Sequence, residues 1–154
     1  MKWVTREKAK VDRIACPWVI KRFVDPQAEF LFVPREKVME VAKEENATPF
    51  DTQGAELMHY KENGEDRVSF DAIIKRYGLK DPALLELAKI VRGADANIPN
   101  APRESPGLEA AALGFRRIAK DDFENMKLQF PFYDAIYSYC QQRLQEGLKL
   151  EHAA

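Results

Sequence analysis

The sequence predicts an α/β domain of the α+β type: a small mixed sheet with an antiparallel hairpin, covered by helices, and a helical C-terminal third. Three patterns support this class: a strand-helix-strand succession near the N-terminus, an Asn63-Gly64 hairpin signal, and helical periodicity from Leu108 onward. The chain of 154 residues fits a single domain, which we expect over residues 1–148, with a disordered tail at 149–154.

The first unit should be a strand at residues 2–5, a helix at 16–24 and a strand at 29–33, the last rich in β-forming side chains. Pro17 is compatible with the first turn of a helix but not with its interior, because it lacks a backbone N–H. The helix should therefore begin near Cys16.

The middle of the chain alternates helices with the hairpin, and prolines and glycines punctuate the boundaries. The expected elements are, in order, a helix at 35–46, hairpin strands at 55–60 and 67–70 at a sheet edge, and helices at 71–77 and 82–95.

Three prolines between residues 98 and 107 predict a rigid loop, and long loops near helix ends often carry ligand contacts. From Leu108 the chain should be helical to Leu148, with a break at 127–131. Cys140 belongs to an apolar stripe on the last helix, which is typical of core packing rather than of a cofactor site.

Composition excludes several classes of protein. The 24 Lys and Arg residues nearly balance the 25 Asp and Glu residues, so no basic field favours direct nucleic-acid binding. No segment has the apolar length of a membrane span or the apolar core of a secretion signal, so we expect a cytoplasmic protein without membrane contact. The sequence contains no glycine-rich phosphate loop, so we expect no nucleotide cofactor.

Cys16 is the candidate catalytic residue. At a helix start, with Arg13 just upstream, its thiolate would be favoured over its thiol, and it should react faster than Cys140. Trp18 and Arg22 share a helix face and, with Arg13, are the candidate oxyanion-binding residues. The alternative is that Cys16 is an inert residue of the core, as most free cysteines are.

His59 is the only interior histidine, since His152 falls in the expected tail. Together with Asp71 and Asp95 it is the candidate metal site, and one imidazole with carboxylates suits a divalent ion such as Zn, Fe or Mn. Strand alternation places Asp71 on the face opposite His59, so this set requires a bulge or an early helix start at Ser69. The alternative is a half-buried, hydrogen-bonded histidine, with Asp95 as a helix-end cap.

Five segments stand in a distinctive order along the chain: DRIACPWVIKRFVDPQAEFLFVP, PFDTQGAELMH, VSFDAIIKRYGL, IVRGAD and FYDAIY. In this order they resemble the C-terminal domain of ChrB-type chromate-resistance proteins, from about Lys2 to Gln142. The family motif falls on Asp12, Arg13, Cys16, Trp18, Arg22, His59, Asp95, Asp134 and Tyr137. The resemblance implies a cytoplasmic role in chromate resistance or sensing. In full-length relatives this domain follows a half implicated in transcriptional control, which this sequence does not match.

Two functions from different classes remain. The preferred hypothesis is a binding or sensing module for a small inorganic oxyanion, a divalent metal ion, or both. The alternative is a thiol- or metal-assisted enzyme resembling a chromate reductase, although the sequence offers no flavin or nicotinamide motif and no resolving cysteine near Cys16. A protein-interaction module without a ligand is a further alternative.

Overall fold

The structure is a computed structural model, and it describes residues 1–147. Its elements are, in chain order, β1 (Lys2–Arg6), α1 (Asp12–Val19), the π-helical turn η1 (Ile20–Val24), β2 (Glu29–Val33), the 3-10 turn η2 (Arg35–Lys37), α2 (Val38–Glu44), β3 (Thr48–Pro49), β4 (Tyr60–Glu62), β5 (Glu65–Arg67), α3 (Ser69–Arg76), α4 (Pro82–Asp95), α5 (Ser105–Ile118) and α6 (Asp122–Gln145). None of the helices in this part of the chain is both long enough and apolar enough to cross a membrane.

The strands form two separate sheets. β2, β1 and β3 lie in that order in a parallel sheet, in which Trp3 is paired with Phe30 on one side and with Thr48 on the other. β4 and β5 form an antiparallel hairpin. Parallel and antiparallel pairing together with a majority of helix confirm the predicted α+β class.

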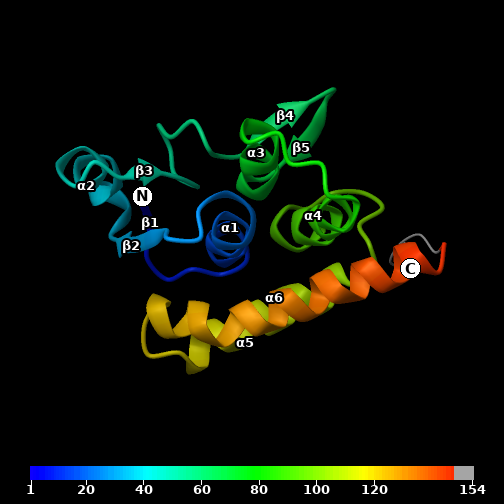
Figure 1. The fold of residues 1–154 in the computed structure, drawn as a ribbon. Coiled ribbons are helices and arrows are strands. Elements are labelled where there is room, and N and C mark those ends of the chain that lie inside the picture. Colours follow the sequence, from blue (N-terminus) through cyan, green and yellow to red (C-terminus); the bar gives the residue numbers. More distant parts are fainter. Residues whose placement is uncertain (148–154) are drawn as a thin grey trace.

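The two faces of the parallel sheet are covered by different helices (Figure 1). Val4 packs with Val38 and Ala42 of α2, whereas its neighbour Trp3 points the other way into the main core. This alternation follows from the period of two along a strand. The helices after β1 and β2 lie on opposite faces, and β2 and β3 lie on opposite sides of β1, so the strand order reverses between β1 and β3 although all three strands are parallel. In open parallel sheets such a point opens a crevice at the carboxyl ends of the strands, where ligands commonly bind.

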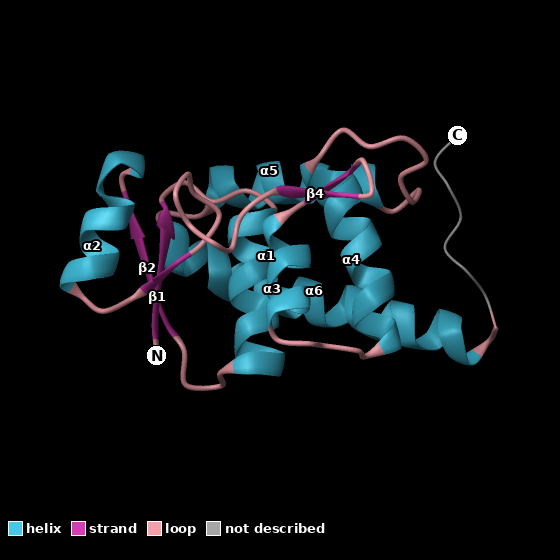
Figure 2. Ribbon diagram, turned by 90° about the horizontal axis from the view of Figure 1, so that it is seen from above, coloured by secondary structure: helices cyan, strands magenta, loops and turns pink. Residues whose placement is uncertain are grey.

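α1 lies at the centre of the molecule, between the parallel strands and α4 (Figure 2). It packs against α3, α4 and α6, and every residue of it except Arg13 is buried. α5 and α6 run side by side beneath this layer (Figure 1). A helix buried on nearly all sides gives its polar residues a low-dielectric environment, which matters for Asp12 and Cys16 below.

The predicted start of the first helix is wrong. α1 begins at Asp12 rather than near Cys16, and Pro17 lies inside it. The helix tolerates the missing proline N–H because burial of flanking residues such as Ile14 and Val19 offsets the lost backbone hydrogen bond.

The hairpin turn is confirmed, but the predicted strands are too long. Asn63 and Gly64 both have positive φ angles, of 53° and 78°, as a type I′ turn requires. The strands have three residues each, and the hairpin forms its own sheet instead of an edge of the parallel one. Helix α3 begins already at Ser69, because the Asp71 carboxylate accepts the N–H of Val68 at 2.9 Å and ends the strand there.

The predicted break at 127–131 is also wrong, since α6 runs through Pro131. The break lies at residues 119–121, where Asp121 caps α6 by accepting the N–H of Glu124 at 2.8 Å. The proline-rich loop between α4 and α5 and the burial of Cys140 agree with the predictions. The expected tail at 149–154 lies outside the described residues.

Candidate metal centre

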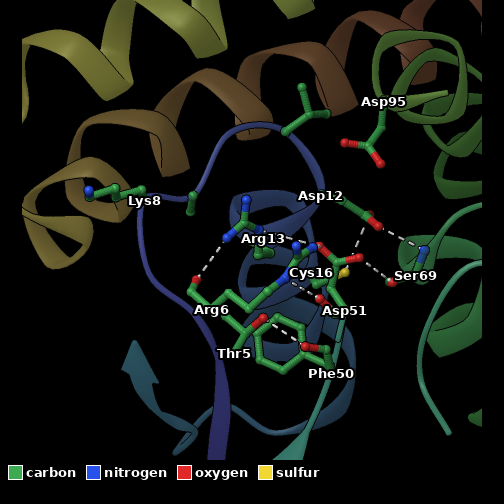
Figure 3. Close-up of polar contacts among 12 residues, drawn as sticks. Thr5, Arg6, Lys8, Asp12, Arg13, Cys16, Phe50, Asp51, Ser69 and Asp95 are labelled. Carbon is green, nitrogen blue, oxygen red and sulfur yellow. Dashed lines mark hydrogen bonds and ion pairs between the residues drawn. The ribbon is translucent and has the colours of Figure 1, made fainter. Parts of the chain in front are cut away.

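Polar side chains from distant parts of the chain converge at the carboxyl ends of β1 and β3, where the sheet topology predicts a crevice. Asp12 is the first residue of α1, and Asp51 follows β3. Asp95 is the last residue of α4. Figure 3 shows the carboxylates of Asp12, Asp51 and Asp95 turned toward one another, with Arg13 beside Asp51.

Asp12 is buried and tied to the start of α3. Its Oδ2 accepts the backbone N–H of Ser69 at 2.8 Å, and its Oδ1 accepts that of Phe70 at 3.0 Å. The residue before α3 is Val68, which has no polar side chain to cap the helix. Asp12 therefore caps α3 from another helix, and the capping contacts fix the orientation of its carboxylate.

One nitrogen of His59 faces all three carboxylates. Its Nε2 lies 3.0 Å from Asp95 Oδ2, 3.3 Å from Asp12 Oδ2 and 3.4 Å from Asp51 Oδ1. The His59 side chain is 45% exposed, while that of Asp12 is 1% exposed. The imidazole therefore closes the cluster on its solvent side.

This crowding shifts the protonation of the cluster. Hydrogen bonds with Asp12 and then Asp95 raise the pKa of His59 to about 10, because they favour the charged imidazolium. Burial, followed by the charge of Asp51, raises the pKa of Asp12 to about 7. The pKa of Asp51 is also raised, chiefly by burial. One imidazolium thus faces more negative charge than it can neutralise.

Two arginines flank the cluster behind Asp51. Arg6 Nη2 and Arg13 Nε each lie 3.5 Å from Asp51 Oδ2, a long separation for an ion pair. Ser69 Oγ donates to Asp51 Oδ1 at 2.8 Å. Arg13 also donates through Nη1 to the carbonyl oxygens of Arg6 and Glu7, at 3.1 Å and 2.8 Å, which holds its guanidinium beside Asp51.

The arrangement can hold a cation. Asp12, His59 and Asp95 each offer one ligand atom, and these atoms all lie within 4.8 Å of one another. One imidazole nitrogen with carboxylate oxygens suits first-row divalent ions such as Zn²⁺, Fe²⁺ or Mn²⁺. Hydrogen bonds that already orient the carboxylates of Asp12 and Asp51 are typical of the outer shell of metal sites.

Of the predicted metal ligands, His59 and Asp95 come together but Asp71 does not. Arg92 binds the Asp71 carboxylate through two nitrogens, at 2.7 Å and 3.0 Å, and Asp71 also caps its own helix. Its oxygens are therefore committed elsewhere. Asp12 takes the place of Asp71 in the candidate set.

Of the predicted oxyanion-binding residues, Trp18 and Arg22 lie together but away from the cluster. Trp18 is buried and donates its indole N–H to Asp134 at 2.8 Å, and Arg22 binds the same carboxylate at 2.9 Å and 3.0 Å. This group joins α1 and η1 to α6. Only Arg13 lies at the cluster.

Cys16 lies neither at a helix start nor at the surface, both of which a reactive thiol at this position would require. Its sulfur is fully buried within α1, and Sγ lies 3.5 Å from Asp12 Oδ1. Burial, followed by the charge of Asp12, raises the pKa of the thiol well above its usual value. The helix start that was expected to favour the thiolate is one turn away, at Asp12.

Sequence reasoning missed Asp12 and Asp51 as members of the cluster. Each follows a strand of the parallel sheet, and the carboxyl ends of parallel strands are where polar residues form sites. That signal was visible for Asp12, which follows the first strand and opens the helix. The signal was hidden for Asp51, because the strand before it consists of residues 48–49 alone. Two residues are too few to show the alternating pattern of a strand.

Comparison with known proteins supports the family resemblance that the five distinctive segments of the sequence indicated. The family model described as "ChrB, C-terminal domain" matches residues 3–140. Protein ChrB of Cupriavidus metallidurans is 38% identical over 123 residues, which are 78% of this chain and 35% of that protein. The chain thus spans about a third of that relative's length. No solved structure matches the chain. The chain belongs to the family of the ChrB C-terminal domain, and so to a chromate-resistance family.

Proposed function

We propose that this domain binds a divalent metal ion through Asp12, His59 and Asp95, with Asp51 beside them, and that this site serves binding or sensing in chromate resistance. The observation that carries the proposal is the convergence of three carboxylates on Nε2 of His59. Carboxylates repel one another, and a divalent cation would relieve that repulsion better than a single imidazolium does.

The chemistry of the set favours a metal over a purely structural ion pair. His59 is half exposed, so an ion can reach its nitrogen from solvent, while the carboxylates beneath are held by α3 and Ser69. Metal binding would displace the imidazole proton, so affinity should increase with pH. The three protein ligands Asp12, His59 and Asp95 leave at least one coordination position for water or an anion.

Arg6 and Arg13 support an oxyanion as the second ligand of this site. Both guanidinium groups lie beside the cluster and make only long contacts with the Asp51 carboxylate, while Arg6 Nε also donates to the Asp51 carbonyl oxygen at 3.0 Å. A tetrahedral dianion such as chromate could occupy an open position on the metal and pair with Arg13. Arg13 thereby keeps the role that the sequence suggested, without Trp18 and Arg22.

A thiol-dependent reductase is less well supported. Both cysteines of the described chain, Cys16 and Cys140, are buried, and burial is the main cause of the raised pKa of each. A buried thiol of high pKa is a poor nucleophile and a slow electron donor.

The test is the metal content of purified protein, measured by mass spectrometry after incubation with Zn²⁺, Mn²⁺ or Fe²⁺ and extensive dialysis. We expect about one ion per chain in the wild type for at least one metal, and a large loss in His59→Ala. His152→Ala is the matched control, because it removes the other histidine of the sequence, and it should retain the metal. Equal metal content in the wild type and His59→Ala would overturn the proposal.

A further inference from the structure

A cavity lies away from the metal cluster, between the hairpin, α4 and the proline-rich loop. Its volume is about 550 Å³, within the range of small-molecule sites. Its walls include Arg67 of β5, Lys89 and Arg92 of α4, and the apolar residues Ile98, Pro99 and Pro102 of the loop. None of the candidate metal ligands lines it.

The charged groups of this cavity are arranged by depth. The side chains of Arg67 and Arg92 are only 16% and 19% exposed, so they belong to the inner wall. The acidic side chains of Glu65 and Asp66 are 71% and 52% exposed, so water screens them.

One acidic side chain of the lining is less exposed. Glu86 is paired with Lys89 at 3.0 Å, which balances its charge. The less exposed wall of the cavity therefore presents the guanidinium groups of Arg67 and Arg92, each of which is also paired with a carboxylate, of Glu65 and Asp71 respectively.

Both inner guanidinium groups keep hydrogen-bond donors for a ligand. Arg92 uses Nε and Nη2 to bind Asp71, and its Nη1 donates to none of the residues in the described part of the chain. Arg67 uses Nη1 to reach Glu65 and the carbonyl oxygen of Asp66, while its Nη2 donates to no described residue. Because its Asp71 partner fixes Arg92, the free donor of that guanidinium is held in place in advance.

We propose that this cavity binds a small organic anion, whose carboxylate or phosphate pairs with Arg67 and Arg92 and whose apolar part lies on Ile98, Pro99 and Pro102. The fixed guanidinium donors match planar carboxylate and tetrahedral phosphate groups alike. The proline-rich wall offers a rigid apolar surface without backbone donors at its prolines. This site does not depend on the proposed metal, although Arg92 is one helical turn from Asp95.

The experiment uses chelator-treated protein, so that its result does not depend on whether the domain binds a metal. Binding of benzoate, phenyl phosphate and inorganic phosphate is measured by calorimetry. Nuclear magnetic resonance then locates the binding through the arginine Nε–H signals and the backbone amides of residues 64–67 and 98–102. We expect at least one of the two aromatic anions to bind, to shift these signals, and to bind more tightly than inorganic phosphate.

Arginine variants distinguish binding in the cavity from nonspecific attraction of the anion to positive charge on the protein. Arg67→Gln should weaken binding by about tenfold or more, because it removes one charged donor group. Arg117→Gln, which makes the same change at an exposed position of α5, should bind as the wild type does. Arg67→Lys, which keeps the charge but not the planar fork, should be intermediate.

The aromatic anion that binds identifies the headgroup class. No binding of either aromatic anion at millimolar concentration would overturn the proposal. So would equal binding by folded Arg67→Gln, or an affinity for inorganic phosphate equal to that for the aromatic anions.

Discussion

The Nε2 atom of His59 lies 3.0 Å from Oδ2 of Asp95, which joins the irregular segment before the hairpin to the last residue of α4. The same nitrogen contacts Asp12, so α1, α4 and this segment meet at one atom. A buried carboxylate that caps α3 and an exposed imidazole thus share one site. Its stability should respond to protons and to metal ions.

The metal-free protein should become less stable as the pH rises from 5 to 9. His59 has a folded-state pKa of about 10 against an ordinary 6.5, so its stabilising contribution is complete below 6.5 and is lost as the pH rises through about 10. The pKa of Asp12 is raised from 3.8 to about 7, and its contribution is likewise lost as the pH rises through about 7. Urea unfolding in chelator at pH 5, 7 and 9 measures the trend.

His59→Gln is the control for this pH dependence, because it cannot be charged. The difference in unfolding free energy between the wild type and His59→Gln should be largest near pH 5 and should shrink toward pH 9. A difference that is constant with pH, or a wild type that becomes more stable toward pH 9, contradicts the predicted protonation of the cluster.

Neither thiol should react in the folded protein. Cys16 and Cys140 are both completely buried, so alkylation requires the chain to open. In mass-mapped alkylation with iodoacetamide, both cysteines should be modified at rates that follow unfolding, and low concentrations of urea should accelerate both. Rapid modification of Cys16 alone, in native buffer, would show that α1 exposes this residue and would restore it as a candidate reactive group.

Gly93→Ala should destabilise the protein by about 1–3 kcal/mol, the usual cost of overpacking. A Cβ at Gly93 would clash with Ser105 Oγ and lie 2.8 Å from Ala101 Cβ, so α4 and the start of α5 would have to separate. Gly114→Ala is the matched control, since nothing lies within 4 Å of its added Cβ. The control should be neutral or stabilise α5 by up to about 1 kcal/mol, because alanine favours helix.

Chemical denaturation of both glycine variants checks this prediction. Equal stability of Gly93→Ala and Gly114→Ala would mean that α4 and α5 do not approach as closely as described.

Asp134→Ala should destabilise the protein by about 1–2 kcal/mol, because it leaves the buried indole of Trp18 without its acceptor. The lost ion pair with Arg22 should add little, since both side chains are substantially exposed. Arg22→Ala is the matched control and should have the smaller effect. Thermal unfolding of the two variants measures both effects. A larger effect of Arg22→Ala would mean that the ion pair, and not the indole hydrogen bond, contributes most of the stability.

The elements predicted correctly are those whose signals are local. α4 begins and ends where expected, because Asp81, Pro82 and a helical apolar stripe all indicate the same boundaries. The Asn63-Gly64 turn is similarly determined by two residues. The start of α1 was mispredicted because its stability at Pro17 comes from packing against other elements, which the local sequence does not show.

Only part of the candidate site was predicted, again because local signals are visible in the sequence and contacts between distant segments are not. His59 and Asp95 stood out by residue type. Strand alternation counted against Asp71, and although α3 does begin at Ser69, the Asp71 carboxylate is bound by Arg92 and by the N–H of Val68. Asp12 and Asp51 meet only because β1 and β3 are neighbours in the sheet. That neighbourhood is a property of the whole topology, so no single segment reveals it.

The most direct test of the metal site is anomalous diffraction from crystals grown with Mn²⁺ or Zn²⁺, recorded on both sides of the absorption edge of the metal. We predict one strong anomalous peak per chain, about 2.0–2.3 Å from Nε2 of His59 and from carboxylate oxygens of Asp12 and Asp95. A fully occupied metal bound elsewhere, or crystals in which His59 still contacts the three carboxylates at saturating metal, would contradict the site.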